Sequence, residues 1–240
     1  MSELQIRWLE HAASTQDEAH QLAATGAAHG SAFAVPVQTE GRGTRGRVWI
    51  SEEGGLWLSV VCRPARGSAV EVVGVRCGLA LARFLDGLVR PPARVALKWP
   101  NDLMLGSGKL GGILAEARWQ GDALAWIVVG VGLNVRNELP AGLTPPAARL
   151  VDAGTVLAPV ELAAPVAQVV ARAALSAEPL STEELAEFAL RDWLRGRRLD
   201  APAVGTADGI SPSGLLRIRQ PDGAVVEVFG RVALAPAARA

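Results

Sequence analysis

Hydrophobic residues recur at steps of three and four between residues 69 and 88, a spacing that places them on one face of an α-helix. This apolar face consists of Val70, Val73, Cys77, Ala80, Leu81, Phe84 and Leu88. Two more helices are predicted over about 160–176 and 182–195. A shorter helix is expected to begin at Ser14-Thr15, because acidic residues follow these hydroxyls at the spacing of a capping box.

Segments rich in Val, Ile, Leu and aromatic residues predict strands between the helices. They are 31–38, 55–63, 94–99, 110–119 and 123–133. The turn Gln120-Gly121-Asp122 joins the last two segments and indicates an antiparallel hairpin. Segment 94–99 is expected to be extended because Pro100 steers Trp99 out of the helical region.

The pattern changes after Arg198, where residues 202–234 hold three or four short strands separated by turns. A tail of this length buries little core alone, so we expect a small β-barrel packed on the main domain. Residues 137–158, rich in Pro, Ala and Gly, are expected to form a loop. The mixture of hairpins and helices predicts an α+β main domain over 1–195 with a largely antiparallel sheet, followed by a small domain over 196–240.

Composition narrows the function classes. Lys and Arg number 24, as do Asp and Glu, so the chain lacks the basic surplus with which proteins bind nucleic acid phosphates. No apolar stretch approaches the ~20 residues of a membrane span, and the N-terminal segment does not resemble a signal peptide. Cys62 and Cys77 show no metal-ligand spacing and are expected to be buried thiols. We therefore expect a cytoplasmic protein with neither nucleic acid nor membrane as partner.

Residues 41–46, Gly-Arg-Gly-Thr-Arg-Gly, match the dinucleotide fingerprint GxGxxG letter by letter. That fingerprint works through a helix that opens at the third glycine, and here Val48-Trp49-Ile50 indicates extended chain instead. The glycines let the backbone approach a ligand closely, and the arginines provide planar cations suited to carboxylate or phosphate. The segment alone is compatible with an anion-binding loop or with a solvated, flexible arginine loop.

Two other clusters favour the ligand loop. Lys98-Trp-Pro-Asn-Asp102 ends one predicted strand, and Gly108-Lys-Leu-Gly-Gly112 begins the next. Gly130-Val-Gly-Leu-Asn134 ends the strand after that. Glycines in a Val- and Ile-rich strand are often bulges, but they also leave room for a ligand. Three such clusters at strand ends predict a shared pocket.

These residues resemble the biotin–protein ligases. Residues 38–49 are similar to the signature GRGRxGRxW with its upstream glutamine, and KWPND, GKLGGILAE and GVGLN follow at 98–102, 108–116 and 130–134 in the family's order. Ser14-Thr15 is similar to the family's N-terminal Ser-Thr. The resemblance implies a catalytic domain related to class II aminoacyl-tRNA synthetases and an SH3-like C-terminal domain. It also implies a monofunctional enzyme, because the Ser-Thr motif lies too near the start for a DNA-binding domain before it.

The resemblance also implies roles for single residues. The biotin pocket would be lined by Ser14, Thr15, Gln38, Gly41, Arg42, Gly112, Gly130 and Gly132. ATP and the adenylate would be surrounded by Arg45, Arg47, Trp49, Asn101, Lys109 and Asn134. Asp102 would lie beside the incoming lysine, and the catalytic set would be Lys109, Arg42 and Asp102.

The chemistry explains why such residues are needed. Biotin's carboxylate must attack the α-phosphate of ATP, and two anions approach each other only when cations neutralise them; Arg42 and Lys109 are the candidates, with Mg²⁺ on the phosphates. The carrier lysine must then be neutral, and Asp102 could orient it, accept its proton or merely cap a turn. The implied acceptor is the biotin carrier domain of acetyl-CoA carboxylase or a related carboxylase, and a homodimer is a possible assembly.

Two positions depart from the family pattern. Thr44 stands where the signature has a second arginine, which predicts faster leakage of biotinyl-AMP. Gln16 replaces the usual Asn after Ser-Thr, with little expected effect. Three other functions stay open at this point: a biotin-sensing repressor, a ligase for lipoate or octanoate, and a non-catalytic biotin-binding module.

Overall fold

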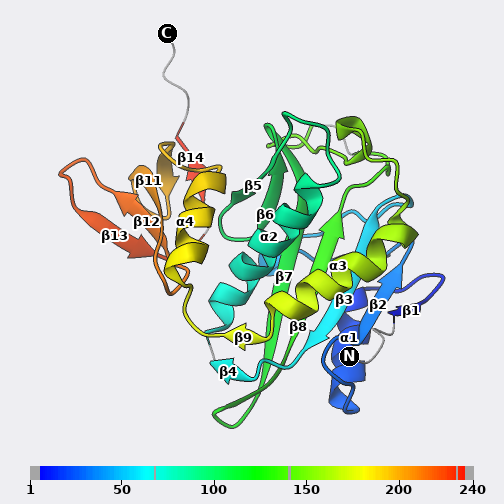
Figure 1. Cartoon of the computed structure of the whole chain (residues 1–240). Helices are drawn as coiled ribbons and strands as arrows, with labels where there is room; N and C mark the ends of the chain where they lie inside the picture. Colours follow the sequence, from blue (N-terminus) through cyan, green and yellow to red (C-terminus); the bar gives the residue numbers. More distant parts are fainter. Residues whose placement is uncertain (1–5, 68, 140–141, 231, 236–240) are drawn as a thin grey trace.

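The computed structural model describes residues 6–67, 69–139, 142–230 and 232–235, which form sheets of seven, five and two strands with helices packed on the largest one (Figure 1). In these residues the larger sheet has seven strands in the order β1-β2-β3-β8-β7-β6-β5. They are β1 (Ile6–Trp8), β2 (Ala32–Val35), β3 (Leu56–Cys62), β5 (Val95–Lys98), β6 (Asp102–Leu105), β7 (Gly108–Gln120) and β8 (Ala123–Leu133). Of their pairings, β1 with β2 is parallel and the others are antiparallel, which confirms the predicted mixed, largely antiparallel sheet.

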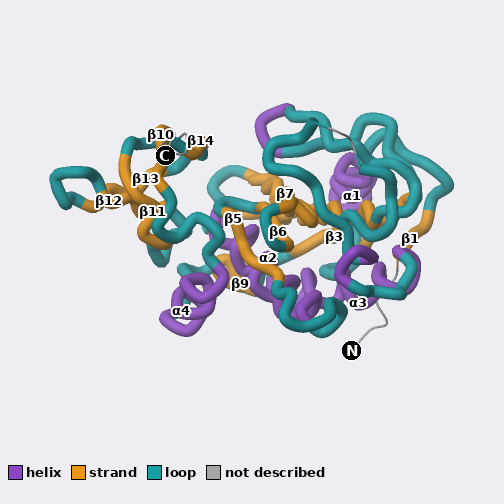
Figure 2. Tube along the Cα trace, turned by 90° about the horizontal axis from the view of Figure 1, so that it is seen from above, coloured by secondary structure: helices purple, strands orange, loops and turns teal. Residues whose placement is uncertain are grey.

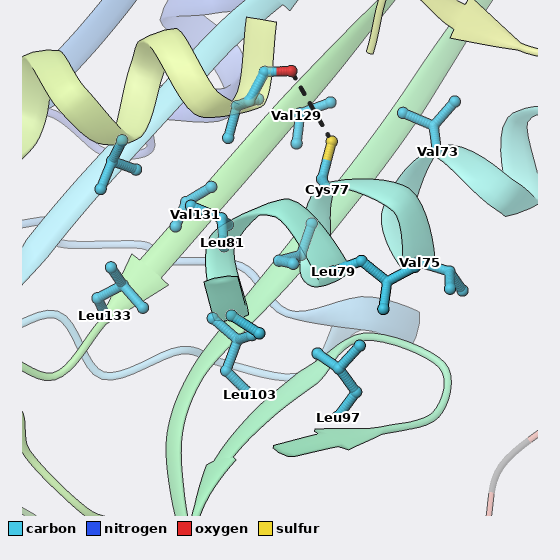
Figure 3. Close-up of a cluster of buried hydrophobic side chains, with 14 of the residues drawn as sticks. Val73, Val75, Cys77, Leu79, Leu81, Leu97, Leu103, Val129, Val131 and Leu133 are labelled. Atoms are coloured by element: carbon cyan, nitrogen blue, oxygen red, sulfur yellow. Dashed lines mark hydrogen bonds between the residues drawn. The ribbon is translucent and has the colours of Figure 1, made fainter. Parts of the chain in front are cut away.

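Helices cover both faces of this sheet. Helix α1 (Thr15–Ala24) packs on β3 and β8 from one side, and α2 (Val70–Asp86) and α3 (Pro159–Ala173) pack from the other, as Figure 2 shows. The main apolar core lies between the sheet and α2 with α3, where the alternating side chains of β8 meet Cys77 and Leu81 of α2 (Figure 3). No helix in the described part of the chain is long and apolar enough to cross a membrane.

The C-terminal strands form a separate antiparallel sheet in the order β13-β12-β11-β10-β14. Its strands are β10 (Arg198–Ala201), β11 (Gly205–Ile210), β12 (Leu216–Arg219), β13 (Val225–Val228) and β14 (Ala233–Leu234). Leu199, Leu216 and Ile218 from this sheet belong to the same apolar cluster as the main domain. The small unit therefore packs its apolar side against its larger neighbour, as its length predicts.

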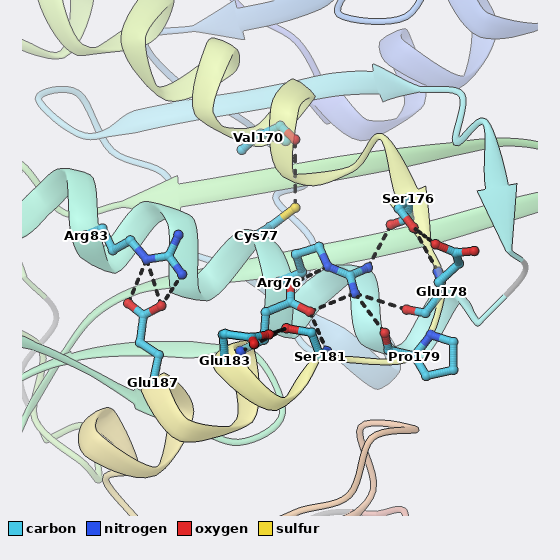
Figure 4. Close-up of polar contacts among 11 residues, drawn as sticks. Arg76, Cys77, Arg83, Val170, Ser176, Glu178, Pro179, Ser181, Glu183 and Glu187 are labelled. Carbon is cyan, nitrogen blue, oxygen red and sulfur yellow. Dashed lines mark hydrogen bonds and ion pairs between the residues drawn. The ribbon is translucent and has the colours of Figure 1, made fainter.

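Ion pairs fasten α4 (Thr182–Arg191) to α2 beside this junction (Figure 4). Arg76 pairs with Glu184 at 2.5 Å and also donates to the carbonyl of Ser176, while Arg83 pairs with Glu187. Arg191 is 6% exposed and donates to Asp86 at 2.8 Å. The buried charge of Arg191 has partners on α2 and β5, and these contacts fix the position of α4. The C-terminal sheet comes after α4 in the chain.

Several predicted boundaries were wrong. β6 was missed because its four residues lie between Pro-Asn and Gly-Ser-Gly and look like a connection. The helix predicted over 182–195 ends at Arg191, since the Trp193 amide donates to the Leu97 carbonyl and draws the chain along β5. The short strands β1, β4 (Arg66–Gly67) and β9 (Ser176–Ala177) were also missed, and the described part of the predicted loop 137–158 includes a 3-10 turn, Val151–Ala153.

Candidate functional site

Glycines gather on the face of the sheet that α1 covers. In the pairing register Trp57, Gly132, Gly112 and Asp102 lie side by side across β3, β8, β7 and β6. Gly130 lies beside Ser59 one row further along, also on this face. Because glycine has no side chain, these rows leave a hollow in the surface of the sheet itself. The side chains of Trp49 and Gln16 fill it in this structure, since a Cβ at Gly132 or at Gly130 would lie within 2.7 Å of one of them.

The Gly/Arg loop (residues 41–49) lies over the hollow and places Trp49 on the glycines. A Cβ atom at Gly132 would be 2.7 Å from Trp49 Nε1, and one at Gly112 would be 3.3 Å from Trp49 Cζ3. Trp49 Nε1 is buried and has no hydrogen-bond partner among the described residues. The structure thus brings together the three glycine-containing clusters that are far apart in the sequence.

The loop is closed by its own main chain. The Gly43 amide donates to the Arg47 carbonyl at 2.7 Å, and the Trp49 amide donates to the Gly41 carbonyl at 2.8 Å. Between them, Thr44–Gly46 forms a single 3-10 turn in which Arg45 has φ +61°. No α-helix begins at this loop within the described residues, so the loop lacks the feature on which the dinucleotide fingerprint depends.

Thr44 is uncharged, and its polar groups bind Arg47. Its hydroxyl accepts a hydrogen bond from Arg47 Nη2 at 2.8 Å, and its carbonyl accepts one from Arg47 Nε at 3.3 Å. The second arginine of the family signature is therefore replaced by a small residue that holds Arg47 against the loop. The guanidinium carbon of Arg45 lies 6.0 Å from the centre of the Phe229 ring.

A β-bulge turns Lys109 toward the hollow. Gly112 pairs with Asp102, but Met104 pairs with Lys109, so Leu110 is an extra residue in β7 and points into the core. Without this insertion Lys109 would lie on the opposite face from Gly112, since side chains alternate along a strand. Instead Lys109 Nζ is 2.5 Å from Asp102 Oδ1 and 4.8 Å from the centre of the Trp49 ring.

Lys98 extends the same row beyond Asp102, its pairing partner across β5 and β6. Its Nζ lies 5.6 Å from the centre of the Trp193 ring. Burial lowers the pKa of Lys98, against the opposing charge of Asp102. Two lysines therefore flank the Asp102 carboxylate.

Polar side chains at the start of α1 form the wall opposite Lys109. Ser14 caps the helix by accepting from the Gln16 amide at 3.3 Å. Gln38 Oε1 accepts from the Thr15 amide at 2.8 Å, and Thr15 Oγ1 is 2.8 Å from Ser59 Oγ. The predicted pocket residues Ser14, Thr15 and Gln38 thus lie in one network with Ser59, which the sequence analysis missed.

Gln16 contributes more than a neighbour of a helix cap would. It is 3% exposed, its Nε2 donates to the Val128 carbonyl at 3.1 Å, and its Oε1 accepts from Ser59 at 3.0 Å. A Cβ at Gly130 would be 2.6 Å from that same oxygen. The expectation that Gln16 matters little overlooked this contact, because it joins α1 to β8 across 112 positions of sequence.

Arg42 is held near the first turn of α1 by two carboxylates. Its Nη2 is 2.6 Å from Asp17 Oδ1 and 3.6 Å from Glu116 Oε2. His20 Nε2 lies 3.3 Å from Glu116 Oε2, and Trp126 Nε1 donates to His20 Nδ1 at 3.1 Å.

The hydrogen bonds from Trp126 to His20 and from His20 to Glu116 determine which ring nitrogen of His20 carries the proton. An indole N–H can only donate, so Nδ1 of His20 accepts and Nε2 carries the proton that is donated to Glu116. This hydrogen bond, with smaller contributions from Gln16 and Arg42, holds the pKa of Glu116 below its usual value despite burial.

Asn101 and Asn134, the two asparagines of the motifs, donate hydrogen bonds to main-chain carbonyls beside the hollow. Asn101 Nδ2 donates to the Ile113 carbonyl at 2.7 Å, and the Ile113 amide returns a bond to the Asn101 carbonyl at 2.9 Å. Asn134 Nδ2 donates to the Lys109 carbonyl at 3.3 Å. Both side chains therefore fix the strand ends from which Asp102 and Lys109 project.

The chain is similar in sequence and in fold to known biotin ligases. The family model described as "Biotin/lipoate A/B protein ligase family" matches residues 9–134. A "Biotin--[acetyl-CoA-carboxylase] ligase" from Paracoccus denitrificans is 34% identical over 233 residues, which cover 90% of this chain and 96% of the relative.

Solved structures agree with this match over almost the whole chain. The biotin protein ligase from Aquifex aeolicus in complex with biotin and ATP has 26% identity and a TM-score of 0.78, with 96% of this chain and 98% of that chain covered. The biotin protein ligase from Leishmania major in complex with biotinyl-5-AMP has 28% identity and a TM-score of 0.62, with 94% and 99% covered. The family match, the nearly full-length relative and the site geometry together establish that the chain belongs to the biotin protein ligases of the biotin/lipoate A/B protein ligase family.

Proposed function

We propose that the chain joins biotin and ATP to biotinyl-5'-AMP on the glycine face of its sheet and passes the biotinyl group to a lysine of a carboxylase carrier domain. The observation that carries this proposal is the meeting of Trp49, the strand glycines and Lys109 above one hollow. Relatives whose names or complexes include biotin, ATP and biotinyl-5-AMP support the choice of ligands.

The polar end of biotin fits the wall formed by α1. Its ureido group offers donors and an acceptor, and burying such a group without partners costs about 1–3 kcal/mol. Ser14, Thr15, Gln38 and Ser59 present hydroxyl and amide groups at that end of the hollow. The apolar arm of biotin would then run over Gly130, Gly132 and Gly112, and the Trp49 ring must shift to admit it, because it lies directly on two of these glycines.

Adenylation requires Arg42 and Lys109 to exchange partners. Each is paired with protein carboxylates, Arg42 with Asp17 and Glu116 and Lys109 with Asp102. When the biotin carboxylate attacks the α-phosphorus, a carboxyl–phosphate bond forms and pyrophosphate leaves. Once they have left these carboxylates, the two cations can stabilise the negative charge that develops at the reacting groups. Arg45, Arg47, Trp49, Asn101 and Asn134 complete this end of the proposed site, and Gly41 belongs to the proposed biotin pocket.

Transfer places the acceptor lysine beside Asp102. The attacking amine must be neutral, and it loses a proton as the amide bond forms and AMP leaves. Asp102 lies in the same row as Gly112 and Gly132, which supports the proposal that its carboxylate orients the amine or accepts that proton.

Magnesium would be bound mainly by the phosphates of ATP. Among the described residues no three His, Cys, Asp or Glu side chains gather at a common point. Mg²⁺ that is bound together with a nucleotide does not require such a cluster, because its ligands are commonly phosphate oxygens, waters and at most one or two carboxylates. When present the ion would add positive charge at the α-phosphate, next to the charges of Lys109 and Arg42.

Incubation with a purified biotin carrier domain, biotin and MgATP tests the function directly. We expect the mass of the carrier to rise by one biotinyl group, and a carrier whose acceptor lysine is replaced by arginine to stay unmodified. ATP–pyrophosphate exchange with biotin and with lipoate then tests the substrate, because the family includes ligases for both acids. Exchange with lipoate alone would overturn the proposal.

The proposed compartment is the cytoplasm. Cys62 and Cys77 are buried free thiols, and burial raises the pKa of Cys77 to about 12. Unreactive thiols of this kind are usual in the reducing cytosol. Fractionation of cells that produce the tagged chain tests the assignment.

A further inference from the structure

The side chain of Phe229 connects the C-terminal sheet to two motifs of the proposed site. Phe229 directly follows β13. Its ring meets Trp99 edge to face, with centroids 6.0 Å apart and planes at 85°, and it lies 6.0 Å from the guanidinium carbon of Arg45. Trp99 is 2% exposed and donates at 2.8 Å to the carbonyl of Gly214 in the turn between β11 and β12, so Phe229 rests on a fixed surface.

Arg45 needs external support more than its neighbours do. Among the described residues, Arg45 is the only non-glycine residue with a left-handed backbone (φ +61°). This conformation costs about 1 kcal/mol or more unless contacts hold it. The described hydrogen bonds of residues 43–47 all lie within the Gly/Arg loop. The Phe229 ring is therefore a contact that reaches the loop tip from outside.

We propose that Phe229 is a positioning residue that couples the C-terminal sheet to the Gly/Arg loop and keeps Arg45 at the ATP site. The ring and the guanidinium attract each other through a cation–π contact. The side chain of Phe229 is 63% exposed, so its removal costs little core packing. This inference rests on the proposed role of Arg45 in ATP binding.

Replacement of the ring tests the contact. We expect Phe229→Ala and Phe229→Leu to raise the KM for ATP about two- to fivefold, the factor of one exposed cation–π contact, and to speed release of biotinyl-AMP. Phe229→Trp keeps the aromatic face and should restore wild-type values. Val225→Ala changes a half-exposed residue of the neighbouring strand and serves as the control.

A second measurement reports on the loop without catalysis. Trypsin cleavage after Arg45 or Arg47, followed by mass spectrometry on the protein without ligands, should be faster in Phe229→Ala and Phe229→Leu. The thermal midpoint should stay close to that of the wild type. If Phe229 had a purely structural role, the thermal midpoint of all three Phe229 variants would fall instead. Cleavage after Arg45 or Arg47 would then increase only in proportion to that loss of stability.

The double variant separates this inference from the proposed site. With Arg45→Met, Phe229→Ala should have no further effect on the KM for ATP or on cleavage after Arg47. Additive effects, or a Phe229→Leu variant indistinguishable from the wild type, would overturn the coupling. An Arg45→Met variant with unchanged KM for ATP would instead remove Arg45 from the proposed site, while the cleavage rates would still decide whether Phe229 holds the loop.

Discussion

The two faces of β8 carry opposite kinds of residue although neighbours on the strand are adjacent in sequence. Val131 is 2% exposed and packs in the apolar cluster with α2, whereas Gly132 next to it carries the Trp49 ring on the other face. One face packs against α2 and α3 in the main apolar core, and the other, beneath α1, carries the glycines and the polar groups of the candidate site. Because side chains alternate along a strand, stability and ligand binding can be changed separately by adjacent substitutions.

Filling the hollow should have the largest effect. In Gly132→Val, the new side chain meets Trp49 and occupies the path proposed for biotin. We expect adenylate formation to fall below detection in ATP–pyrophosphate exchange, while the circular dichroism spectrum and cooperative unfolding are kept. Val131→Ala on the other face is the matched control, and activity retained in Gly132→Val would contradict the assignment of this face.

Removal of the positive charge of Lys109 beside the hollow should have the second-largest effect. Lys109→Gln deletes the cation that the bulge turns toward Trp49 and Asp102. We expect kcat for adenylation to fall about 100-fold, the usual scale for one positioned charge-stabilising group. Arg118→Gln, at an exposed position further along β7, should leave kcat unchanged. Equal losses in both variants would mean that the lysine acts only through general charge.

The apolar face should respond in stability. Val131→Ala removes two buried methyl groups from the core between β8 and α2 and should lower the free energy of unfolding by about 1.5–3 kcal/mol. Urea unfolding measures this loss. The KM for biotin should stay at its wild-type value, and a large change in KM would show that the two faces are not independent.

A smaller effect is expected where the polar face meets α1. In Gln16→Asn the amide is one methylene shorter and cannot bond both Ser59 and the Val128 carbonyl. We expect the KM for biotin to rise about tenfold, which corresponds to one lost hydrogen bond in a buried network. Gln21→Asn, at an exposed position of the same helix, is the control. An unchanged KM would favour the original expectation that this position tolerates either amide.

The smallest effect concerns the Gly/Arg loop. Thr44→Arg restores the arginine of the family signature and frees Arg47 from the threonine hydroxyl. We expect release and hydrolysis of biotinyl-AMP to slow a few-fold, because one more exposed cation near an anionic adenylate contributes about 0.5–1 kcal/mol. Thr44→Val removes the hydroxyl without adding charge and should not slow release. Equal hydrolysis rates for wild type and Thr44→Arg would rule the idea out.

Local patterns predicted those elements whose partners are near in sequence. The helix observed at Val70–Asp86 and the hairpin of β7 and β8 follow from periodicity and from the turn at Gly121. Short elements with distant partners, such as β1 and β6, were missed because three or four residues carry too little periodic signal.

The candidate site shows the same division. Gly112, Gly132 and Lys109 could be assigned from their motifs. The contacts of Gln16, Ser59, Glu116 and Phe229 were not foreseen, although Gln16 and Glu116 lie beside or within quoted motifs. Each of these four residues reaches the site through a contact that joins segments far apart in the chain. Such contacts depend on how strands are ordered and which helix covers them, and neither is encoded in a short stretch of residues.

The sequence by itself determined the kinds of element, the positions of the glycines and the charges available for an anionic ligand. Only the tertiary structure decided which of these meet, because the row from Trp57 to Asp102 depends on the register of four strands and on one extra residue, Leu110. A shift of that register by one residue would exchange the two faces and bury the lysine among valines. Alternation is a local property of a strand, whereas register is set by packing of the whole sheet.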